Sequence, residues 1–232
     1  DLHSFPTRRS SDLRTYIPMV DMATRIMMGE SLADMGYAPG LNPAKDYVAV
    51  KVPVFSFSKL EDVDTQLGPE MKSTGEVLGV AKHFGDAIYK GLVASGSEMA
   101  REGAALLTVR DLDKPEIIGI GRRFHDLGFK IHATVGTAMA LREHGIPVHV
   151  VRRLSEARPN IGDLLDGREV NYVISTSTKG RQPGMDEVKM RRKAVESSIG
   201  LITALDTARA ILDCLESGRT LAEISLVDIT EI

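Results

Sequence analysis

The sequence predicts an α/β fold in which a Rossmann-like parallel sheet carries helices on both faces. From Ala105 onward, strand-like and helix-like segments alternate five times, and parallel neighbouring strands need crossover connections of this kind. The strand-like segments are short and nearly continuous in apolar residues, as expected for strands buried on both faces. A chain of 232 residues with 43% hydrophobic and 26% charged residues is long enough to bury such a core.

The start of the chain is less regular than the rest. Residues 1–13 show no periodicity and resemble a translated sequencing adapter, so we exclude them from the fold as a non-native leader. Pro18 in a first turn and apolar residues at three- and four-residue spacing predict a helix over 17–28, which Gly29 ends. A second, short helix is expected over 31–36.

A strand and a further helix complete the N-terminal part. Residues 46–55 predict a strand, in which Pro53 indicates an edge or a bulge. The string over 68–79 then leads into a helix over 84–92. A shift in composition at 94–97 marks a domain boundary.

One strand–helix–strand–helix unit forms the centre of the predicted fold. Residues 105–109 predict a buried strand, and Pro115 opens a helix that Gly128 ends. A second strand over 129–133 turns into another helix through 134–138. Such a turn leaves free backbone N–H groups at one edge of the sheet.

The remaining elements continue the alternation. They are a strand over 146–151, a helix over 161–165, a strand over 170–176, a charged helix over 185–198, a strand over 201–202 and a closing helix over 203–212. Thr203 is expected to cap the closing helix, and Glu187 and Arg191 are expected to form an exposed pair on the charged helix. Residues 221–229 are expected to lie as a tail against the domain or its neighbour.

Hydroxyls and positive charge gather at the carboxyl ends of the predicted strands. Backbone amides, the hydroxyls of Thr134 and Thr137 and the ammonium of Lys114 would form an anion-binding crevice, with phosphate as its natural ligand. A structural alternative stays open, in which Thr137 only caps a helix and Thr134 only ends a strand. Residues 175–178 place a second group of hydroxyls at another strand end, which favours a ligand.

The string over 68–79 and residues 47–51 resemble the end of the second synthetase half of the carbamoyl-phosphate synthase large subunit. Beyond Gly96 the chain is similar to the methylglyoxal-synthase-like regulatory domain of that subunit. The resemblance implies a C-terminal fragment with two domains. These are the end of an ATP-grasp α+β domain over 14–96 and an allosteric domain over 97–232.

The resemblance also implies a parent enzyme and what this fragment lacks. The parent is a ligase that makes carbamoyl phosphate for pyrimidine and arginine pathways from bicarbonate, ATP with Mg or Mn, and ammonia from a glutaminase small subunit. In the family, the ligands of the magnesium–ATP complex lie upstream of the segment that begins near Ile17. The fragment alone is therefore expected to be inactive and to hold no cofactor, and its partners would be the rest of the large subunit and an effector.

In the family, a nucleotide monophosphate effector of the UMP or IMP type sits over these strand ends. Lys114 and Arg153 would supply charge, and Asp186 would accept a hydrogen bond from the ribose or base. Arg153 stands in place of a familiar lysine and Ser175 in place of a familiar asparagine, so the identity of the effector stays open. Carried over residue by residue, the effector-binding positions are Thr108, Lys114, Thr134, Thr137, Arg153, Ser175, Thr176, Ser177 and Asp186.

Departures from the resembled proteins argue against two further activities. Thr203 matches a contact of the ornithine site of some members, but Val52 replaces a glutamate and Leu201 a tyrosine, so we predict no ornithine control. Methylglyoxal synthase carries an essential aspartate where this chain has 158–160. Because the nearby Asp163 is interpreted as a solvated helix residue, lyase activity is not expected.

Composition argues against several other classes of function. A net charge of −3 gives no field that would recruit nucleic acid or an anionic membrane, and the basic run 189–193 is interpreted as a solvated helix face. A stand-alone phosphate-binding or interaction module stays the alternative. Cys214 is expected to carry a buried, inert thiol. Residues 119–121 are interpreted as a site of helix packing, and the histidines do not have the spacing of metal ligands. Without a membrane span or signal segment in the sequence, a cytoplasmic location is expected.

Overall fold

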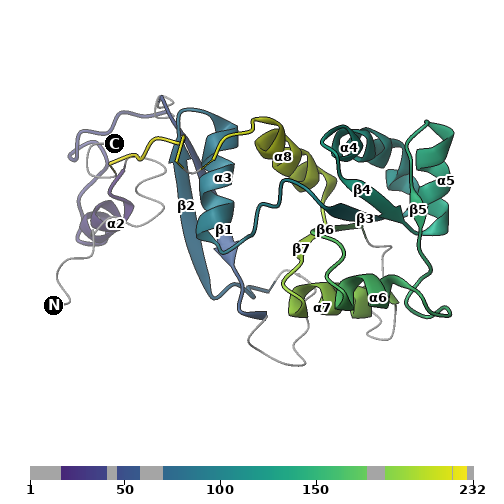
Figure 1. Cartoon of the computed structure of the whole chain (residues 1–232). Coiled ribbons are helices and arrows are strands. Elements are labelled where there is room, and N and C mark those ends of the chain that lie inside the picture. Colours follow the sequence, from purple (N-terminus) through teal and green to yellow (C-terminus); the bar gives the residue numbers. More distant parts are fainter. Residues whose placement is uncertain (1–16, 41–45, 58–69, 177–185, 221, 229–232) are drawn as a thin grey trace.

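Five parallel strands form the central sheet of the chain (Figure 1). The structure is a computed structural model that describes residues 17–40, 46–57, 70–176, 186–220 and 222–228. The strand order is β5-β4-β3-β6-β7, and every neighbouring pair is parallel, which confirms the predicted fold class. The strands are β3 (Ala104–Thr108), β4 (Lys130–Ala133), β5 (His149–Val150), β6 (Tyr172–Ser175) and β7 (Gly200–Ile202).

Helices cover both faces of this sheet. One face carries α4 (Lys114–Asp126), α5 (Val135–Glu143) and α8 (Leu205–Glu216), and the other carries α6 (Ile161–Asp166) and α7 (Asp186–Glu196). Successive residues of β3 point to opposite cores, so that Leu107 packs on the α4 side and Leu106 on the α7 side. Burial on both faces is the reason that this strand is a continuous apolar run.

Aromatic side chains and one glycine determine the packing of the larger core. Phe124 of α4 meets Phe129 edge-on with 5.4 Å between ring centroids, and Tyr172 of β6 lies 5.7 Å from Phe124. A Cβ on Gly121 would lie 2.7 Å from Cδ2 of Leu141 in α5. A Cβ at this position would therefore force the Leu141 side chain to move, which supports the packing role predicted for this stretch at Gly121, whereas a Cβ on Gly119 would meet nothing within 4 Å.

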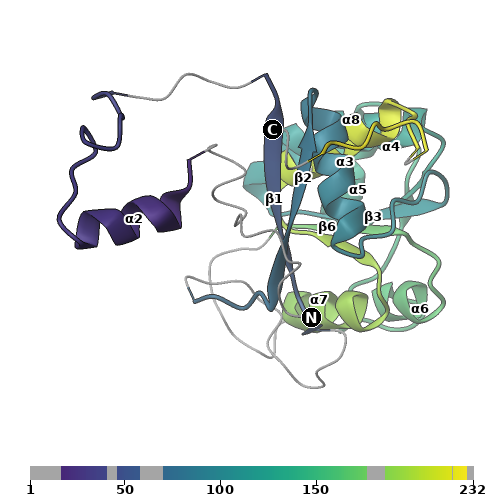
Figure 2. The same ribbon diagram turned by 90° about the vertical axis from the view of Figure 1, so that its left-hand side faces the viewer.

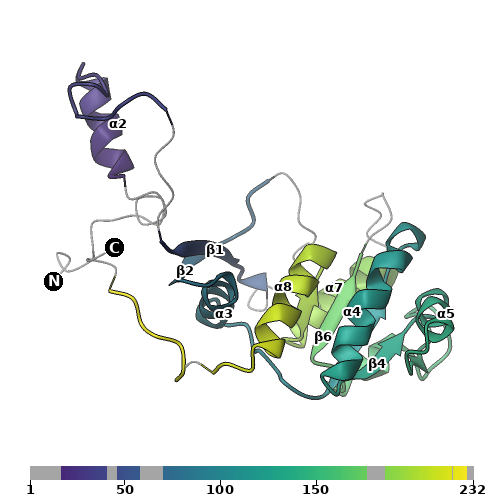
Figure 3. The ribbon, with the colours of Figure 1, turned by 90° about the horizontal axis from the view of Figure 1, so that it is seen from above.

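The N-terminal part is an antiparallel pair of strands covered by one helix (Figure 2). Strand β1 (Val48–Val54) pairs along its whole length with β2 (Gly75–Ala81), and α3 (Phe84–Ala94) packs on both. Helix α3 also packs on α8, which joins this part to the parallel sheet. Helix α2 (Met19–Met27) has no buried residue and stands apart from the other elements (Figure 3).

The segment after α8 returns to the N-terminal part. Lys90 Nζ of α3 donates to the carbonyl oxygen of Ser225 at 2.7 Å, and Ile224 is buried. Arg101 donates to the carbonyl oxygen of Gly218 at 2.6 Å. The described part of the tail thus lies against the neighbouring N-terminal part, which is one of the two positions that the sequence predicted.

Some predicted elements are wrong in detail. Residues 31–36 form turns, because the Ser31 hydroxyl bonds the Asp34 carboxylate at 2.7 Å and such local bonds compete with a helix. The string before α3 contains strand β2, which two glycines in five residues concealed. Thr203 does not cap α8: the N-cap position is Ala204, without a side-chain hydrogen bond. Residues 1–13 lie outside the described part.

Candidate functional site

The carboxyl ends of β3, β4 and β6 bound a cavity of about 460 Å³. Thr108 ends β3 and Thr134 follows β4, and their hydroxyl oxygens lie 3.1 Å apart. Ser175 ends β6, and Thr176 comes directly after it. Because β3 lies between β4 and β6, the two groups of hydroxyls meet at one edge of the sheet.

Two hydroxyls fasten the loop that follows β3. The Val109 N–H donates to Thr137 Oγ1 at 3.2 Å, and the Arg110 N–H donates to Thr176 Oγ1 at 3.2 Å. The Arg110 guanidinium also donates to Asp113 at 2.8 Å. This bond and a hydrogen bond with the Thr176 side chain hold the pKa of the Asp113 carboxyl below its usual value. The loop is thus tied to the first turn of α5 and to the end of β6.

Positive charge lies beside the first turn of α5. The Lys114 ammonium, at the start of α4, pairs with Asp111 at 2.7 Å. A Cβ on Gly136 would lie only 3.1 Å from Lys114 Nζ, so this glycine leaves room for the ammonium at the helix. The α5 cap residue, Thr134, makes no side-chain cap bond, and the first N–H groups of any helix lack intrahelical partners.

The far wall of the cavity comes from the segment after β5 and from α7. Arg153 and Leu154 line it on one side, and Asp186 and Met190 line it on the other. Asp186 accepts hydrogen bonds from both the N–H and the hydroxyl of Ser155, the first at 3.0 Å. This contact connects the segment after β5 to the beginning of α7.

A buried ion pair lies behind this wall. Arg191 donates to Glu187 Oε1 at 2.6 Å and to the carbonyl oxygen of Ser175 at 2.9 Å, and its side chain is 8% exposed. Burial lowers the pKa of Arg191 and raises the pKa of Glu187, and their mutual attraction opposes both shifts. The prediction that this pair is exposed is wrong, because its helix face packs against β6.

Six of the nine predicted effector positions line the cavity. They are Thr108, Thr134, Arg153, Ser175, Thr176 and Asp186. Lys114 and Thr137 are not among its lining residues, and Thr137 is buried with its oxygen bonded to the loop. Ser177 lies outside the described residues. Sequence reasoning missed Arg110, Glu187 and the apolar wall of Leu154, Ile161 and Met190.

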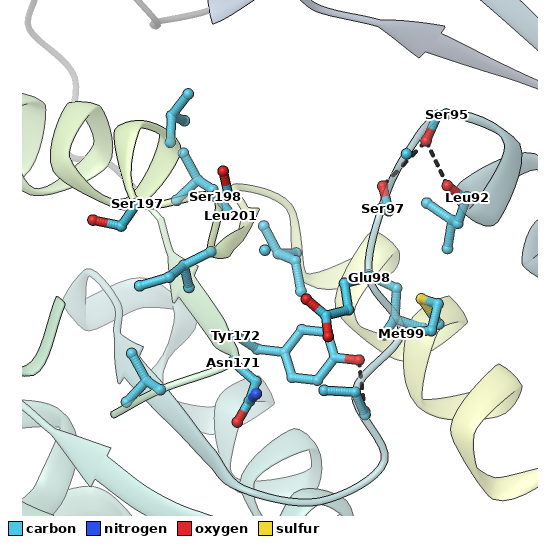
Figure 4. Close-up of a pocket in the computed structure, with 18 of the residues that line it drawn as sticks. Leu92, Ser95, Ser97, Glu98, Met99, Asn171, Tyr172, Ser197, Ser198 and Leu201 are labelled. Carbon is cyan, nitrogen blue, oxygen red and sulfur yellow. Dashed lines mark hydrogen bonds between the residues drawn. The ribbon is translucent and has the colours of Figure 1, made fainter. Parts of the chain in front are cut away.

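A second cavity, of about 680 Å³, lies between the N-terminal part and the parallel sheet (Figure 4). Thr203 and Leu201 line it together with Tyr172, whose hydroxyl donates to a backbone carbonyl at 2.8 Å. Burial raises the pKa of Tyr172. Glu98 contributes a carboxylate to the lining (Figure 4). Val52 is not among the lining residues, and its Cγ2 lies against Gly91 of α3.

Asp163 is held in place by local bonds, which corrects its interpretation as a solvated residue. It forms a reciprocal capping box with Asn160 at the start of α6 and accepts from Arg158 Nε at 2.7 Å. The side-chain bond from Arg158 and the Asn160 N–H hold the pKa of this carboxyl below its usual value. Such a carboxylate has its lone pairs engaged in the fold.

The basic run 189–193 is not a uniformly solvated face either. Arg191 and Met190 are buried, and Lys193 pairs with Asp166 at 2.6 Å. This run therefore supports the packing of α7 on β6 and α6 more than it presents charge to solvent.

The described residues also bear on the cysteine, on metal binding and on membrane spans. Cys214 is buried and contacts the carbonyl oxygen of Gly85 at 3.4 Å, and burial raises the pKa of its thiol to about 11, as expected for an inert cysteine. Among the described residues, no three His, Cys, Asp or Glu side chains gather as a metal site would require. No helix in these ranges has the length and apolar character needed to cross a bilayer.

Comparison with known proteins agrees with this architecture. Residues 116–203 match the family described as MGS-like domain, and this stretch holds strands β4 to β7. A carbamoyl phosphate synthase large chain from Agathobacter rectalis is 47% identical over 204 residues, which are 88% of this chain. The resemblance to that large chain is confirmed. The present chain spans 19% of the length of this relative. The stretch that matches the MGS-like domain supplies most of the residues that line the 460 Å³ cavity, and residues 108–111 of the lining lie before it.

Two solved structures align with about half of this chain at 17% sequence identity. A structure titled "Crystal structure of ForH" covers 50% of this chain and 79% of its own, with a TM-score of 0.40. A methylglyoxal synthase from Elizabethkingia anophelis NUHP1 covers 48% of this chain and 78% of its own, with a TM-score of 0.39. The fold class rests on the strand order and the family match.

Proposed function

We propose that this chain is the regulatory part of a carbamoyl phosphate synthase large chain and that it binds a nucleoside monophosphate of the UMP or IMP type. The observation that carries the proposal is the convergence of hydroxyls from three strand ends on one cavity, next to the N-terminus of α5. Open α/β sheets bind ligands at the carboxyl ends of their strands.

The phosphate would lie at the threonine end of the cavity. Thr108 and Thr134 offer hydroxyl donors there, and the first N–H groups of α5 point toward the same end. Lys114 would supply charge from behind Gly136, because its ammonium already lies against the first turn of α5. A cation and helix amides together bind a phosphate more strongly than neutral donors do.

The nucleoside would occupy the other end. Leu154, Ile161 and Met190 give that end an apolar surface on which a planar ring can rest. Arg153 reaches the cavity from the segment before α6, and it has no ion-pair partner among the described residues. It would contact the phosphate attached to the ribose. Its planar guanidinium offers several N–H donors in a fixed geometry, whereas the ammonium of a lysine is a compact charge.

The proposed role in the parent enzyme is regulation of carbamoyl phosphate synthesis. Bicarbonate, ATP with its metal, and ammonia from a glutaminase subunit would react elsewhere in that enzyme, so the chain alone should not turn over substrate. Effector binding regulates only if it favours one arrangement of the neighbouring part over another, and a coupling free energy of about 1–3 kcal/mol is typical. The packing of α3 on α8 is the contact through which the two parts would be coupled.

Isothermal titration of the 232-residue chain with UMP, IMP and inorganic phosphate tests the proposal. Replacing Lys114 by alanine removes a charge-assisted contact and should weaken binding about 10-fold or more. Lys130→Ala is the matched control, because Lys130 is exposed at the opposite end of β4 and should leave affinity unchanged. Absence of binding by the folded chain, or equal losses in both variants, would refute the proposed site.

A further inference from the structure

Glu187 holds a carboxylate in the cavity wall in a fixed orientation. Its Oε1 accepts from Arg191 at 2.6 Å, and Arg191 is held in turn by the carbonyl oxygen of Ser175 at 2.9 Å. Among the described residues, no hydrogen bond reaches Oε2 of Glu187. Within the described part of the chain, the wall therefore offers one oriented carboxylate with an oxygen that no donor engages.

Ser175 supplies an unpartnered group beside it. Its side chain is 1% exposed and lines the cavity, and its hydroxyl oxygen has no hydrogen-bond partner within the described structure. A buried hydroxyl without a partner costs free energy that a ligand can recover by bonding to it. Glu187 thus supplies a hydrogen-bond acceptor and Ser175 supplies a hydroxyl, and both groups could bond to polar atoms on the edge of a ligand.

The residues around Glu187 and Ser175 indicate which part of a ligand would lie beside them. Met190 and Ile161 give this end of the cavity an apolar surface. The cations by the loop after β3 are Arg110 and Lys114, which pair with Asp113 and Asp111. A carboxylate repels phosphate, so the anionic end of a ligand would lie away from Glu187. A flat, neutral ring with an N–H donor on its edge fits the carboxylate end.

We infer that Glu187 is the residue that recognises the base of the effector, by accepting a hydrogen bond from a ring N–H while the Ser175 hydroxyl bonds the adjacent ring carbonyl. The inference rests on the proposed nucleotide site and adds to it the residue that selects the base. The ligand class is a nucleoside monophosphate whose ring carries an N–H next to a carbonyl. Arg191 acts as a positioning residue, because it orients the carboxylate without reaching the cavity lining.

Matched ligands test this assignment on the full 232-residue chain. The affinities of UMP and N3-methyl-UMP, and of IMP and N1-methyl-IMP, are compared by titration with ribose 5-phosphate as the ligand without a base. Methylation removes the ring donor, so it should weaken binding of at least one pair about 10-fold or more. In Glu187→Gln, which keeps the shape but loses the charge, the penalty of methylation should fall to about threefold or less.

Controls separate this inference from the site itself. Ribose 5-phosphate should bind Glu187→Gln and the unmodified chain equally, which also shows that the variant is folded. Glu196→Gln changes an exposed carboxylate at the end of the same helix and should keep the full methylation penalty. A methylation penalty that Glu187→Gln leaves unchanged, or no penalty at all, overturns the role of Glu187 while ribose 5-phosphate binding keeps the phosphate site. Failure of every phosphate ligand to bind overturns both.

Discussion

Replacing Arg191 by methionine tests how the wall of the cavity is held together. The substitution keeps an unbranched side chain but removes the bonds to Glu187 at 2.6 Å and to the Ser175 carbonyl at 2.9 Å. It leaves a carboxylate that is 23% exposed without its cation. Breaking a buried pair in this way costs about 3–5 kcal/mol, which corresponds to a fall in Tm of about 6–20 °C for a chain of this size.

The loss in this variant should depend on pH with a defined sign. Burial already raises the pKa of Glu187, and removing Arg191 removes the attraction that opposes that rise. A carboxyl whose folded pKa lies above its unfolded value destabilises the fold as pH rises from about 4.3 toward the folded pKa. Thermal unfolding followed by circular dichroism should therefore show a larger deficit at pH 7.5 than at pH 4.5.

A double variant supplies the control for this reasoning. Glu187→Leu combined with Arg191→Met leaves no unpaired charge, and buried ion pairs replaced by apolar side chains are often neutral in stability. The double variant should therefore recover most of the loss in unfolding free energy. A single variant that loses less than about 1 kcal/mol, or a double variant that is no better than the single one, would refute the view that the pair is buried and coupled.

Further outcomes can be checked on the same chain. His132 stacks on His149 of the neighbouring strand, with 5.3 Å between the ring centroids. Burial and, to a lesser extent, His149 lower the pKa of His132, so the free energy of unfolding should fall as pH drops below about 6.5. The variant His132→Asn should show a weaker dependence of stability on pH. Cys214 should react with a thiol reagent only at the rate of unfolding, and fast labelling of the native chain would contradict its burial. Gly79→Ala should lower the free energy of unfolding by about 1–3 kcal/mol in a denaturant titration, because its Cβ would lie 1.9 Å from a carbonyl oxygen of α3. Gly75→Ala is the control and should cost less, because its Cβ would have its nearest contact at 3.8 Å.

The parallel sheet could be predicted because its central strands are buried on both faces and must be apolar. Leu106 and Leu107 point to opposite cores, so β3 had to be apolar at every position and was visible as a run. The pair β1 and β2 is exposed on more of its surface, and Gly75 and Gly79 interrupt the pattern of β2. Gly79 is explained only by the backbone of α3 lying against it, which is information that no local pattern contains.

The candidate site was predictable to the extent that it lies at strand ends. Thr108, Thr134 and Ser175 are fixed by the positions at which β3, β4 and β6 stop, and the sequence shows those positions. Glu187 and Arg191 lie on a helix whose spacing predicts their pairing correctly. It does not predict that the pair faces β6, because the rotation of a helix about its axis is set by tertiary packing when charged residues surround it.

The hydrogen bonds around the cavity bear on how an effector could act. Thr137 accepts a hydrogen bond from the Val109 N–H, Thr176 accepts one from the Arg110 N–H, and Asp186 accepts one from the Ser155 N–H. Loops that are fastened in this way lose little conformational entropy when a ligand binds, so binding itself costs less. For the same reason, ordering of these loops supplies little differential free energy for regulation. A regulatory signal would instead have to travel through packed elements, and the packing of α8 on α3 is the contact by which the parallel sheet reaches the N-terminal part.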